Sequence, residues 1–384
     1  MQRIYSGKEV IRAGEKLLDV ELVRTQPDEY SASMDVLSYW RFSHEKALDS
    51  AFNLLQDIAR KKDKATIFAK RLKRYASIVA KLRRFEQMKL KNMQDIGGCR
   101  AIVANEKKLR QLVRDLRKRS EFKTAQGKIR SKDYIKNPKD DGYRGYHLIG
   151  QFSGDNSEKK SIEIQIRTAL QHDWATALEI VDLFTGQALK SNRGDAAWKT
   201  FFRNISRQFA IMESIHLFDT LTPRQKFETY GEVILNNKSL IEACRDAKQS
   251  SEKLSVVDTL QAFAHGLKIV DERLSQVLVT GYALIEVNTK KKQVSVSIFS
   301  DDMNAEAEER YIQCEKTAAA TDHLVVALVS TTAVGGLKEA YPNYFADSTD
   351  FVRHLLLINS LELPKGGGSI WSDFYRRLFR WREK

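Results

Sequence analysis

The sequence predicts an α+β protein built around a mixed β-sheet. Three observations indicate this class: helical periodicity over residues 39–93, short apolar runs that alternate with helical stretches over 99–184, and a second group of short apolar runs after residue 280. Of the 384 residues, 42% are apolar and 9% are aromatic, so the chain can bury more than one core. We therefore expect roughly two or three domains.

The first part of the chain is expected to form two helices that lead into a strand. One apolar stripe at helical spacing comprises Ala47, Ala51, Leu54, Leu55 and Ile58. The next comprises Ile67, Leu72, Ile78 and Leu82. Residues 99–104 (CRAIVA) are typical of a short buried strand, and residues 107–118 are typical of a helix.

A β-hairpin is predicted next, from two apolar or alternating runs at residues 146–152 and 161–166 that flank a polar segment. In the second run, Glu163 and Gln165 alternate with isoleucines, so the two polar side chains are expected on one face of the strand. From Arg167 the period is again helical, to about residue 184. That polar face is either a functional surface or a solvated one.

The remaining chain predicts a helical stretch and a small α/β domain. A polar stretch near residue 190 marks a boundary, and helical periodicity then runs over 196–278. A ββαβ pattern follows: strands at 283–288 and 294–299, a helix at 305–320, a strand at 323–330, and a final helix at 350–358. The predicted parts are a mixed-sheet domain (1–192), a helical connector (193–278), a small α/β accessory domain (279–363), and a flexible linker with a basic aromatic tail (364–384).

The positive charge is concentrated in one window. The chain has 64 Lys and Arg against 50 Asp and Glu, a formal charge of +14. Residues 51–150 hold 28 basic and 10 acidic side chains, whereas the rest of the chain holds 36 basic and 40 acidic ones. Such a window indicates an anionic ligand, and the aromatic basic tail leaves open packing onto the body or contact with RNA or a membrane.

Composition excludes several classes. No apolar run approaches the roughly 20 residues of a membrane-spanning helix. The charged N-terminus lacks the apolar core of a signal peptide, so a cytoplasmic location is expected. Three widely separated cysteines predict buried free thiols rather than disulfides or a zinc site.

The basic window contains a cationic cluster followed by an isolated carboxylate. A helix over residues 71–84 would place Arg71, Arg74, Lys81 and Arg84 on neighbouring turns, with Lys73 and Ser77 adjoining. Such a cluster is either a solvated face or a site for an anion. Asp95, before a Gly-Gly pair, is a candidate magnesium ligand because Mg²⁺ prefers oxygen ligands, and a turn residue is the alternative.

Residues 131–149 combine loop-forming, cationic and aromatic residues. Pro138 and Gly142 indicate a loop. The cations are Lys132, Lys136, Lys139 and Arg144, and the aromatics are Tyr134, Tyr143 and Tyr146. Nucleotides need charge for the phosphates and flat faces for the base, so this loop is a candidate nucleotide site, with a mobile basic loop as the alternative.

Five segments in order resemble the RelA/SpoT-type alarmone synthetases. They are RLKRYASIVAK, DIGGCRAIV, KDYIKNPKDDGYRGYH, IEIQIRT and QHDWATALE, and they span residues 71–179. The resemblance implies a nucleotidyltransferase-like mixed sheet and Mg²⁺-dependent transfer of pyrophosphate from ATP to the ribose 3′ hydroxyl of GDP or GTP. No His-Asp metal motif of the family's hydrolase module is evident, so a single-activity synthetase with a C-terminal extension is expected.

The resemblance also implies roles for three groups of residues. The ATP-binding group is Arg71, Lys73, Ser77, Lys81 and Arg100, with the two arginines around the adenine and the others on the phosphates. The acceptor-binding group is Lys132, Lys139, Tyr143 and His147, with Tyr143 stacked on the base. Asp95 and Glu163 are implied as catalytic groups and metal ligands, Glu163 alternatively accepting the proton of the attacking hydroxyl.

Several alternatives stay open. Asp141 stands where many relatives carry Asn, and Gly145 replaces the usual Ser, both in the acceptor loop. Toxin-like members of the family pyrophosphorylate the 3′ end of tRNA, so tRNA or an adenine nucleotide is an alternative acceptor. A non-catalytic nucleotide sensor is the third reading, and the sequence leaves the formation of a homo-oligomer open.

Overall fold

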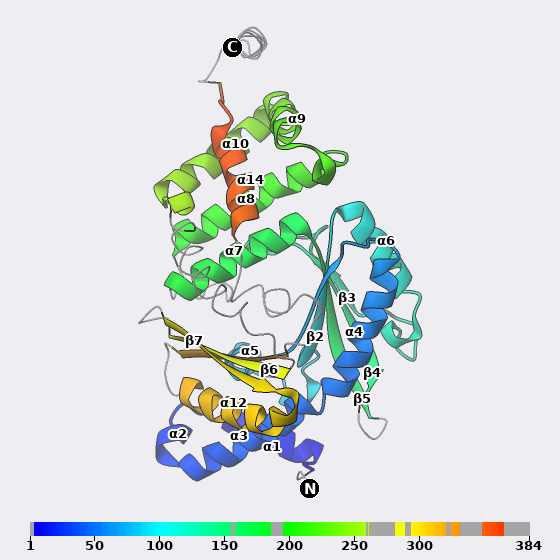
Figure 1. Ribbon diagram of the computed structural model, residues 1–384, viewed down its shortest axis with the longest axis vertical. Coiled ribbons are helices and arrows are strands. Elements are labelled where there is room, and N and C mark those ends of the chain that lie inside the picture. The colour runs from blue at the N-terminus through cyan, green and yellow to red at the C-terminus, as the bar shows by residue number, and fades with distance from the viewer. Residues whose placement is uncertain are drawn as a thin grey trace.

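A five-stranded mixed sheet forms the centre of the protein (Figure 1). The computed structural model describes residues 4–154, 158–185, 195–258, 260, 281–288, 293–319, 324–330 and 348–364. The strands are β1 (Ile67–Leu72), β2 (Gly97–Val103), β3 (Ser131–Asp133), β4 (Tyr146–Ser153) and β5 (Lys159–Thr168). They lie in the order β1-β2-β5-β4-β3, with β2 and β5 parallel and all other neighbours antiparallel. The predicted α+β class with a mixed sheet is confirmed.

One face of this sheet is apolar and covered by two helices. Helices α4 (Glu45–Arg60) and α6 (Glu106–Leu116) pack on it. The three isoleucines of β5 that alternate with Glu163 and Gln165 are fully buried there. The predicted hairpin of β4 and β5, the strand at 99–104 and the helix at 107–118 are therefore confirmed, and the opposite face of the sheet carries the polar side chains.

The second predicted helix is partly wrong. Residues 67–72 form β1, an edge strand paired with β2, and α5 begins only at Tyr75 and ends at Arg84. Arg71 therefore lies on a strand opposite Gly98, not on a helical turn. The apolar residues of a short edge strand match a helical period by chance, and periodicity alone does not separate the two over so short a run.

Three N-terminal helices pack around α5. They are α1 (Gly7–Lys16), α2 (Leu22–Thr25) and α3 (Pro27–Phe42). Their apolar residues, such as Val10, Met34 and Leu37, form one core with Ile78 and Leu82 of α5. The start of α5 is thereby fixed against the N-terminal part of the chain.

A helical bundle lies beyond the other end of the sheet. It comprises α7 (Ala169–Thr185), α8 (Ala196–Ser214), α9 (Pro223–Leu235), α10 (Lys238–Lys253) and α14 (Thr349–Ser360). Phe351 of α14 packs against Phe201, Phe202 and Phe209 of α8, so the last of the described helices joins this bundle (Figure 1). The predicted helical stretch is confirmed over 196–253, and 261–278 lie outside the described residues.

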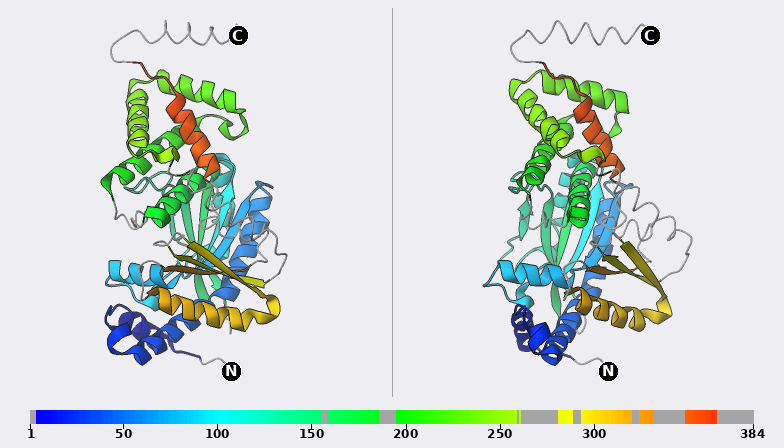
Figure 2. Two further views of the ribbon diagram at one scale, coloured as in Figure 1. Left: turned by 60° about the vertical axis from the view of Figure 1, so that its left-hand side comes forward. Right: turned by 90° about the vertical axis from the view of Figure 1, so that its left-hand side faces the viewer.

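The predicted ββαβ unit is present after residue 280. Its strands β6 (Gly281–Asn288), β7 (Gln293–Ser300) and β8 (Leu324–Ser330) form an antiparallel sheet in the order β7-β6-β8, covered by α12 (Asn304–Ala319). This unit lies beside the N-terminal helices, in the half of the molecule away from the helical bundle (Figure 2). The short 3₁₀ helices are Leu90–Asn92, Ser120–Phe122, Phe218–Thr220 and Asp301–Met303.

Some expectations fall on residues that the structure does not describe. They are the polar boundary at 191–194, the turn at 289–292 and the tail from 365 onward, so the predicted domain limits stay predictions. The predicted free, buried thiols Cys99, Cys244 and Cys314 are confirmed. Among the described helices, none combines the length and apolarity that crossing a membrane requires.

Candidate functional site

Polar side chains from all five strands line the face of the sheet opposite α4 and α6. Strand register places Arg71 of β1 beside Gly98 of β2, and Gly98 beside Glu163 of β5. The next row across the sheet comprises Arg100, Gln165, His147 and Lys132. Because side chains alternate along a strand, both rows point to the same face. The predicted polar face of Glu163 and Gln165 is therefore part of a larger polar surface.

Asp95 lies in the loop before β2 between two lysines. Lys73 Nζ is 3.0 Å from Asp95 Oδ2, and Lys81 Nζ is 2.8 Å from Asp95 Oδ1. Lys73 belongs to the loop between β1 and α5, and Ser77 lies on α5 one turn before Lys81. The structure thus brings together four residues of the predicted ATP and metal groups, with one carboxylate between two ammonium groups.

Arg100 provides a buried positive charge beside this cluster. Burial, reinforced by the neighbouring guanidinium groups of Arg167 and Arg71, lowers its pKa to about 9. Within the described part of the chain, Arg100 Nε and His172 Nδ1 have no hydrogen-bond partner. Burial, then Arg100 and Arg167, hold the pKa of His172 well below its ordinary value, so this imidazole is neutral. Unsatisfied buried polar groups of this kind are available to a ligand.

Glu163, His147 and Tyr143 form a hydrogen-bonded relay. His147 Nδ1 is 2.9 Å from Glu163 Oε1, and His147 Nε2 is 2.6 Å from the Tyr143 hydroxyl. Gln165 Nε2 donates to the other Glu163 oxygen at 2.7 Å. The sequence predicts Glu163 in the metal site or as a base and His147 on the acceptor phosphates, whereas the structure joins both to Tyr143.

The relay favours charged groups. Burial would raise the pKa of Glu163, but His147, then Gln165 and Lys73, hold it well below its ordinary range. Burial would lower the pKa of His147, but Tyr143 and Glu163 raise it. Burial would also raise the pKa of Tyr143, yet Arg167 and His147 outweigh it and lower that pKa to about 7. These shifts favour an ionised Glu163 beside a protonated His147, and they place the titration of Tyr143 near neutral pH.

Cations surround the ring of Tyr143. Lys139 Nζ lies 4.6 Å from its centroid and 4.7 Å from that of Tyr134, and the Arg167 guanidinium carbon lies 5.1 Å from the Tyr143 centroid. Tyr134 and Trp174 meet the ring edge-on. Stacking of an acceptor base on Tyr143 thus stays a prediction. Tyr146, predicted as a further flat face, is instead buried in the core on the opposite side of the sheet.

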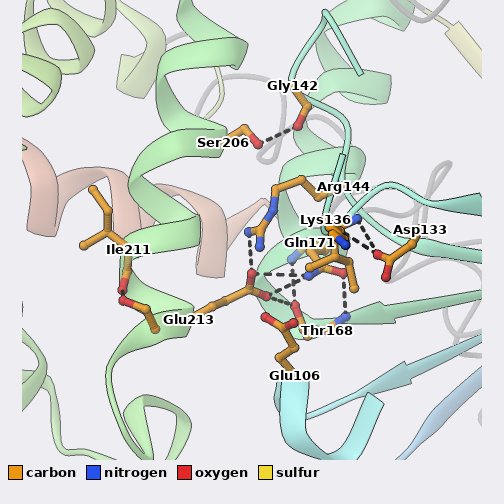
Figure 3. A network of polar contacts seen from close by, with 12 residues as sticks. Glu106, Asp133, Lys136, Gly142, Arg144, Thr168, Gln171, Ser206, Ile211 and Glu213 are labelled. Carbon is orange, nitrogen blue, oxygen red and sulfur yellow. Dashed lines mark hydrogen bonds and ion pairs between the residues drawn. The ribbon is translucent and has the colours of Figure 1, made fainter. Parts of the chain in front are cut away.

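Helix α8 holds the loop between β3 and β4, which is the predicted acceptor loop, through buried polar contacts (Figure 3). The Glu213 carboxylate binds Arg144 and Thr168, and accepts bonds of 3.1 and 3.2 Å from Gln171 Nε2. The loop composition predicts that Arg144 is a cation for a ligand. In the structure, Glu213 neutralises it instead. On the other side of Tyr143, Ser206 donates to the carbonyl of Gly142.

Gly142 shows how closely the loop approaches this helix. Its φ of +94° lies in the left-handed region, and an added Cβ would lie 3.0 Å from the Cα of Arg203 on α8. Both the conformation and the space require glycine. The two residues that flank Tyr143 are thus fixed to α8.

Asp95 and Glu163 are the carboxylates available for a metal. Lys73 binds Asp95, and its charge also contributes to lowering the pKa of Glu163. Across the described ranges, no group of three or more His, Cys, Asp or Glu side chains is arranged to hold a metal ion. A hard cation would therefore take its remaining oxygen ligands from water or from substrate phosphates, which is the usual situation for Mg²⁺.

Residues 70–180 match the sequence model of a family described as "Region found in RelA / SpoT proteins". The chain carries a RelA/SpoT-type domain. The five segments that predict this resemblance all fall within the matched residues or end at their limit. The RelA/SpoT-type domain includes every predicted site residue, from Arg71 to Glu163.

Two curated relatives from Bacillus subtilis (strain 168) are similar to the RelA/SpoT-type domain. GTP pyrophosphokinase YjbM is 32% identical over 111 residues, which cover 28% of this chain and 51% of the relative. GTP pyrophosphokinase YwaC is 33% identical over 115 residues, which cover 28% and 52%. The chain thus spans about half the length of the curated relatives it matches.

Solved structures of alarmone synthetases resemble part of the chain. Small alarmone synthetase 1 from Bacillus subtilis is 23% identical, with a TM-score of 0.40, over 52% of this chain and 98% of that one. The same synthetase bound to its product pppGpp is 24% identical, with a TM-score of 0.36, over 50% and 93%.

Two functional candidates are not predicted from the sequence. Arg167 lies in the IEIQIRT segment, and its position two residues after Gln165 on the same strand face is a signal that could have identified it. Glu213 lies outside the RelA/SpoT-type domain on a helix with no motif. Its partners become neighbours only through the packing of α8 on the acceptor loop.

Proposed function

We propose that this protein transfers pyrophosphate from ATP to the ribose 3′ hydroxyl of GDP or GTP, in the cytoplasm, with Mg²⁺. The observation that carries the proposal is the convergence of two sets of groups on one face of the sheet. One set is Asp95 between Lys73 and Lys81, and the other is the relay of Glu163, His147 and Tyr143. The curated relatives named GTP pyrophosphokinase support the same reaction class.

The lysines and arginines are suited to the donor. Lys73 and Lys81 would bind the phosphates of ATP, with Ser77 adding a hydroxyl donor from the same helix. Arg71 and Arg100, where the charge of Arg71 helps to lower the pKa of Arg100, would lie around the adenine. Planar guanidinium groups stack on aromatic rings and remain charged at physiological pH, so they suit this role.

The relay is suited to the acceptor. In the proposed step the acceptor 3′ oxygen forms a bond to the β-phosphorus of ATP, and the bond from that phosphorus to the α-phosphate bridging oxygen breaks. AMP leaves with that oxygen, and the hydroxyl proton passes to Glu163. Positioning and electrostatic stabilisation supply most of the rate in such a transfer.

Asp95 and Glu163 fit Mg²⁺ because they present carboxylate oxygens on the same face of the sheet as lysines suited to phosphate. When bound, the ion would neutralise charge on the transferred phosphates. Asp95 would exchange its two lysines for the ion, which frees both ammonium groups for the donor. Glu163 would either share the ion or stay paired with His147.

The proposal is tested with ATP labelled at the β- or the γ-phosphate. The reaction contains full-length protein, Mg²⁺ and GDP or GTP. We expect a guanosine product that carries the label from either form of ATP, together with an equal amount of unlabelled AMP. A product that carries the γ-label alone would indicate an ordinary kinase. Absence of any labelled guanosine product, with protein that is folded and binds ATP, would reject the proposed acceptor.

One observation favours tRNA as a second candidate acceptor. Residues 107–132 hold 11 basic and two acidic side chains, and they lie on α6 and the segments up to β3. A groove of about 500 Å³ there is lined by Arg110, Arg114, Arg117, Ser131, Asp133, Tyr146 and Val113. Tyr146 faces away from His147, so this groove is on the reverse face of the sheet. A second cationic surface suits a long polyanion rather than a single nucleotide.

Salt-dependent tRNA binding tests this candidate. Arg114→Ala with Arg117→Ala is expected to weaken binding and to reduce the slope of log affinity against log salt by roughly two, because two phosphate contacts are lost. Arg224→Ala with Arg353→Ala, which changes exposed arginines of α9 and α14, is the matched control. Unchanged binding in the first variant, or no labelled tRNA from labelled ATP, would reject this candidate.

A further inference from the structure

A buried ion pair joins the C-terminal part of the chain to the N-terminal helices. Arg41 Nη1 on α3 donates to Glu315 Oε2 on α12 at 2.8 Å, and the two side chains are 3% and 5% exposed. Arg41 Nη2 also donates to the Tyr311 hydroxyl at 2.6 Å, and that hydroxyl donates to Glu315. On the surface beside this pair, Lys316 donates to Ser31 at 2.8 Å. Helix α12 is therefore docked by specific polar contacts.

The same pair reaches the loop that precedes α5. Arg41 Nε donates to the carbonyl of Lys73 at 2.8 Å, and Glu315 Oε1 accepts a bond of 3.1 Å from the backbone N–H of Tyr75. These two contacts bracket Arg74, the residue that begins the helix. Two consecutive peptide groups at the start of α5 are thus held by α3 and α12.

Glu315 acts as a helix cap supplied from a distant part of the chain. The first N–H groups of a helix lack partners within it, and a side-chain oxygen at the N-cap usually binds one of them. Arg74 occupies the N-cap, and an arginine side chain has no acceptor. Glu315 supplies that acceptor to Tyr75, and its negative charge lies at the positive end of the α5 dipole.

We propose that Glu315 and Arg41 are positioning residues for the donor half of the site, so that docking of α12 sets the affinity for ATP. The donor half comprises Lys73, Ser77, Lys81 and Asp95. The inference rests on the proposed function for the identity of the donor. Lys73 is held at its carbonyl by Arg41, and Ser77 and Lys81 follow on the helix that Glu315 caps. A shift at the start of α5 displaces all three groups, and with them the lysine contacts of Asp95.

The geometry favours support rather than obstruction. Burial would lower the pKa of Arg41, but Glu315 and Tyr311 outweigh it and raise that pKa, so Arg41 stays charged and is bound by the Glu315 carboxyl group. Glu315 contacts backbone at the start of α5, while Lys73 Nζ and Lys81 Nζ point to Asp95. The contacts of α12 thus leave these ammonium groups available to phosphates.

The test is calorimetric binding of ATP, and separately of GDP, to the full-length chain. Glu315→Gln is expected to weaken ATP binding about tenfold and to leave GDP binding unchanged, a size typical of a lost charged cap and ion pair. Glu309→Gln changes an exposed acid on the same helix and is the matched control. Because a buried unpaired Arg41 can impair folding, the double variant Arg41→Met with Glu315→Leu replaces the pair by apolar side chains. It is expected to fold and still to bind ATP more weakly.

Each outcome of these binding measurements either supports or overturns the inference. A selective loss of ATP affinity in both variants supports the inference. Unchanged ATP affinity, tighter ATP binding, or an equal loss for ATP and GDP overturns it, the last because it indicates a purely structural role. If the parent chain binds ATP and Glu315→Gln weakens it, yet no pyrophosphate is transferred, the proposed reaction fails and the inference stands. A parent chain that binds no ATP overturns both.

Discussion

The two halves of the candidate site are held in different ways. In the donor half, Lys73 and Lys81 are 22% and 28% exposed and share one carboxylate. In the acceptor half, Arg144 and Glu213 are 9% and 4% exposed and form an ion pair with each other. The comparison indicates that the donor half can exchange Asp95 for phosphate or metal, whereas the loop of the acceptor half is anchored by buried contacts within the protein.

The backbone of the two halves is anchored in the same way. Each depends on a buried glutamate from outside the RelA/SpoT-type domain, Glu315 of α12 for the donor loop and Glu213 of α8 for the acceptor loop. The surrounding helices therefore do more than cover the sheet. They fix the backbone on either side of the groups that would contact substrate.

The largest effect on the rate is expected from a change of Asp95. Asp95→Asn should lower the rate of pyrophosphate transfer by at least about 100-fold, because a charged group that organises the transferring phosphates is lost. ATP binding should persist, since Lys73 and Lys81 are released from the carboxylate. Single-turnover kinetics and ATP binding are measured together, with Asp350→Asn on the surface of α14 as control. A normal rate in Asp95→Asn would remove this residue from the chemistry.

The acceptor half is broken selectively through Glu213. Glu213→Gln leaves buried Arg144 without its charge partner, a change that costs roughly 3–5 kcal/mol in comparable pairs. If about 2 kcal/mol of this falls on the loop, the KM for the acceptor rises about 30-fold while the KM for ATP is unchanged. Steady-state kinetics with each substrate varied provide the measurement. Glu228→Gln, an exposed acid of α9, should change neither constant, and a rise in both constants for Glu213→Gln would contradict separate halves.

A change in the donor half should affect the KM for ATP and leave the KM for the acceptor unchanged. Lys81→Ala removes one phosphate-binding cation from a partly exposed site, so the KM for ATP should rise about fivefold and that for the acceptor should not change. Lys89→Ala, which changes a surface lysine paired with Glu15, is the control. Equal effects on the two substrates would show that Lys81 does not belong to one half.

The smallest effect is spectroscopic. Tyr143 is expected to titrate at a pKa of about 7, because Arg167 and His147 outweigh the effect of burial. Ultraviolet titration should show tyrosinate absorbance appearing near neutral pH, and Tyr143→Phe should abolish it while Tyr134→Phe should not. Arg167→Gln should move the transition to higher pH. A first tyrosine transition near the ordinary value in the parent chain would contradict the electrostatics of the acceptor half.

Much of the fold could be predicted from the sequence where local patterns are long. The β4–β5 hairpin, α6 and the ββαβ unit have clear periods, and in the hairpin and α6 the burial follows those periods. The edge strand β1 could not be separated from a helix because its six residues carry too little periodic information. The packing of α14 on α8 depends on contacts between segments about 150 residues apart, for which local pattern gives no signal.

The candidate site was predictable to the extent that it lies in contiguous motifs. Asp95, Lys73 and Lys81 lie together as the resemblance implies. The link from Glu163 through His147 to Tyr143 and the anchoring of Arg144 required the structure, because they join different elements. The basic residues of the window 51–150 lie on two surfaces. One group lines the site, and the group over 107–132 lies on α6 and the segments that lead to β3.

The most direct test of the central claim is mass spectrometry of products from ATP with GDP, GTP, AMP, ADP and tRNA offered together to the full-length protein and Mg²⁺. The predicted result is a guanosine nucleotide that gains one pyrophosphoryl group, with matching formation of AMP, and neither product in Asp95→Asn. A gain on tRNA alone would replace the acceptor by the second candidate. No pyrophosphoryl gain on any acceptor, or a gain of a single phosphate, would contradict the account.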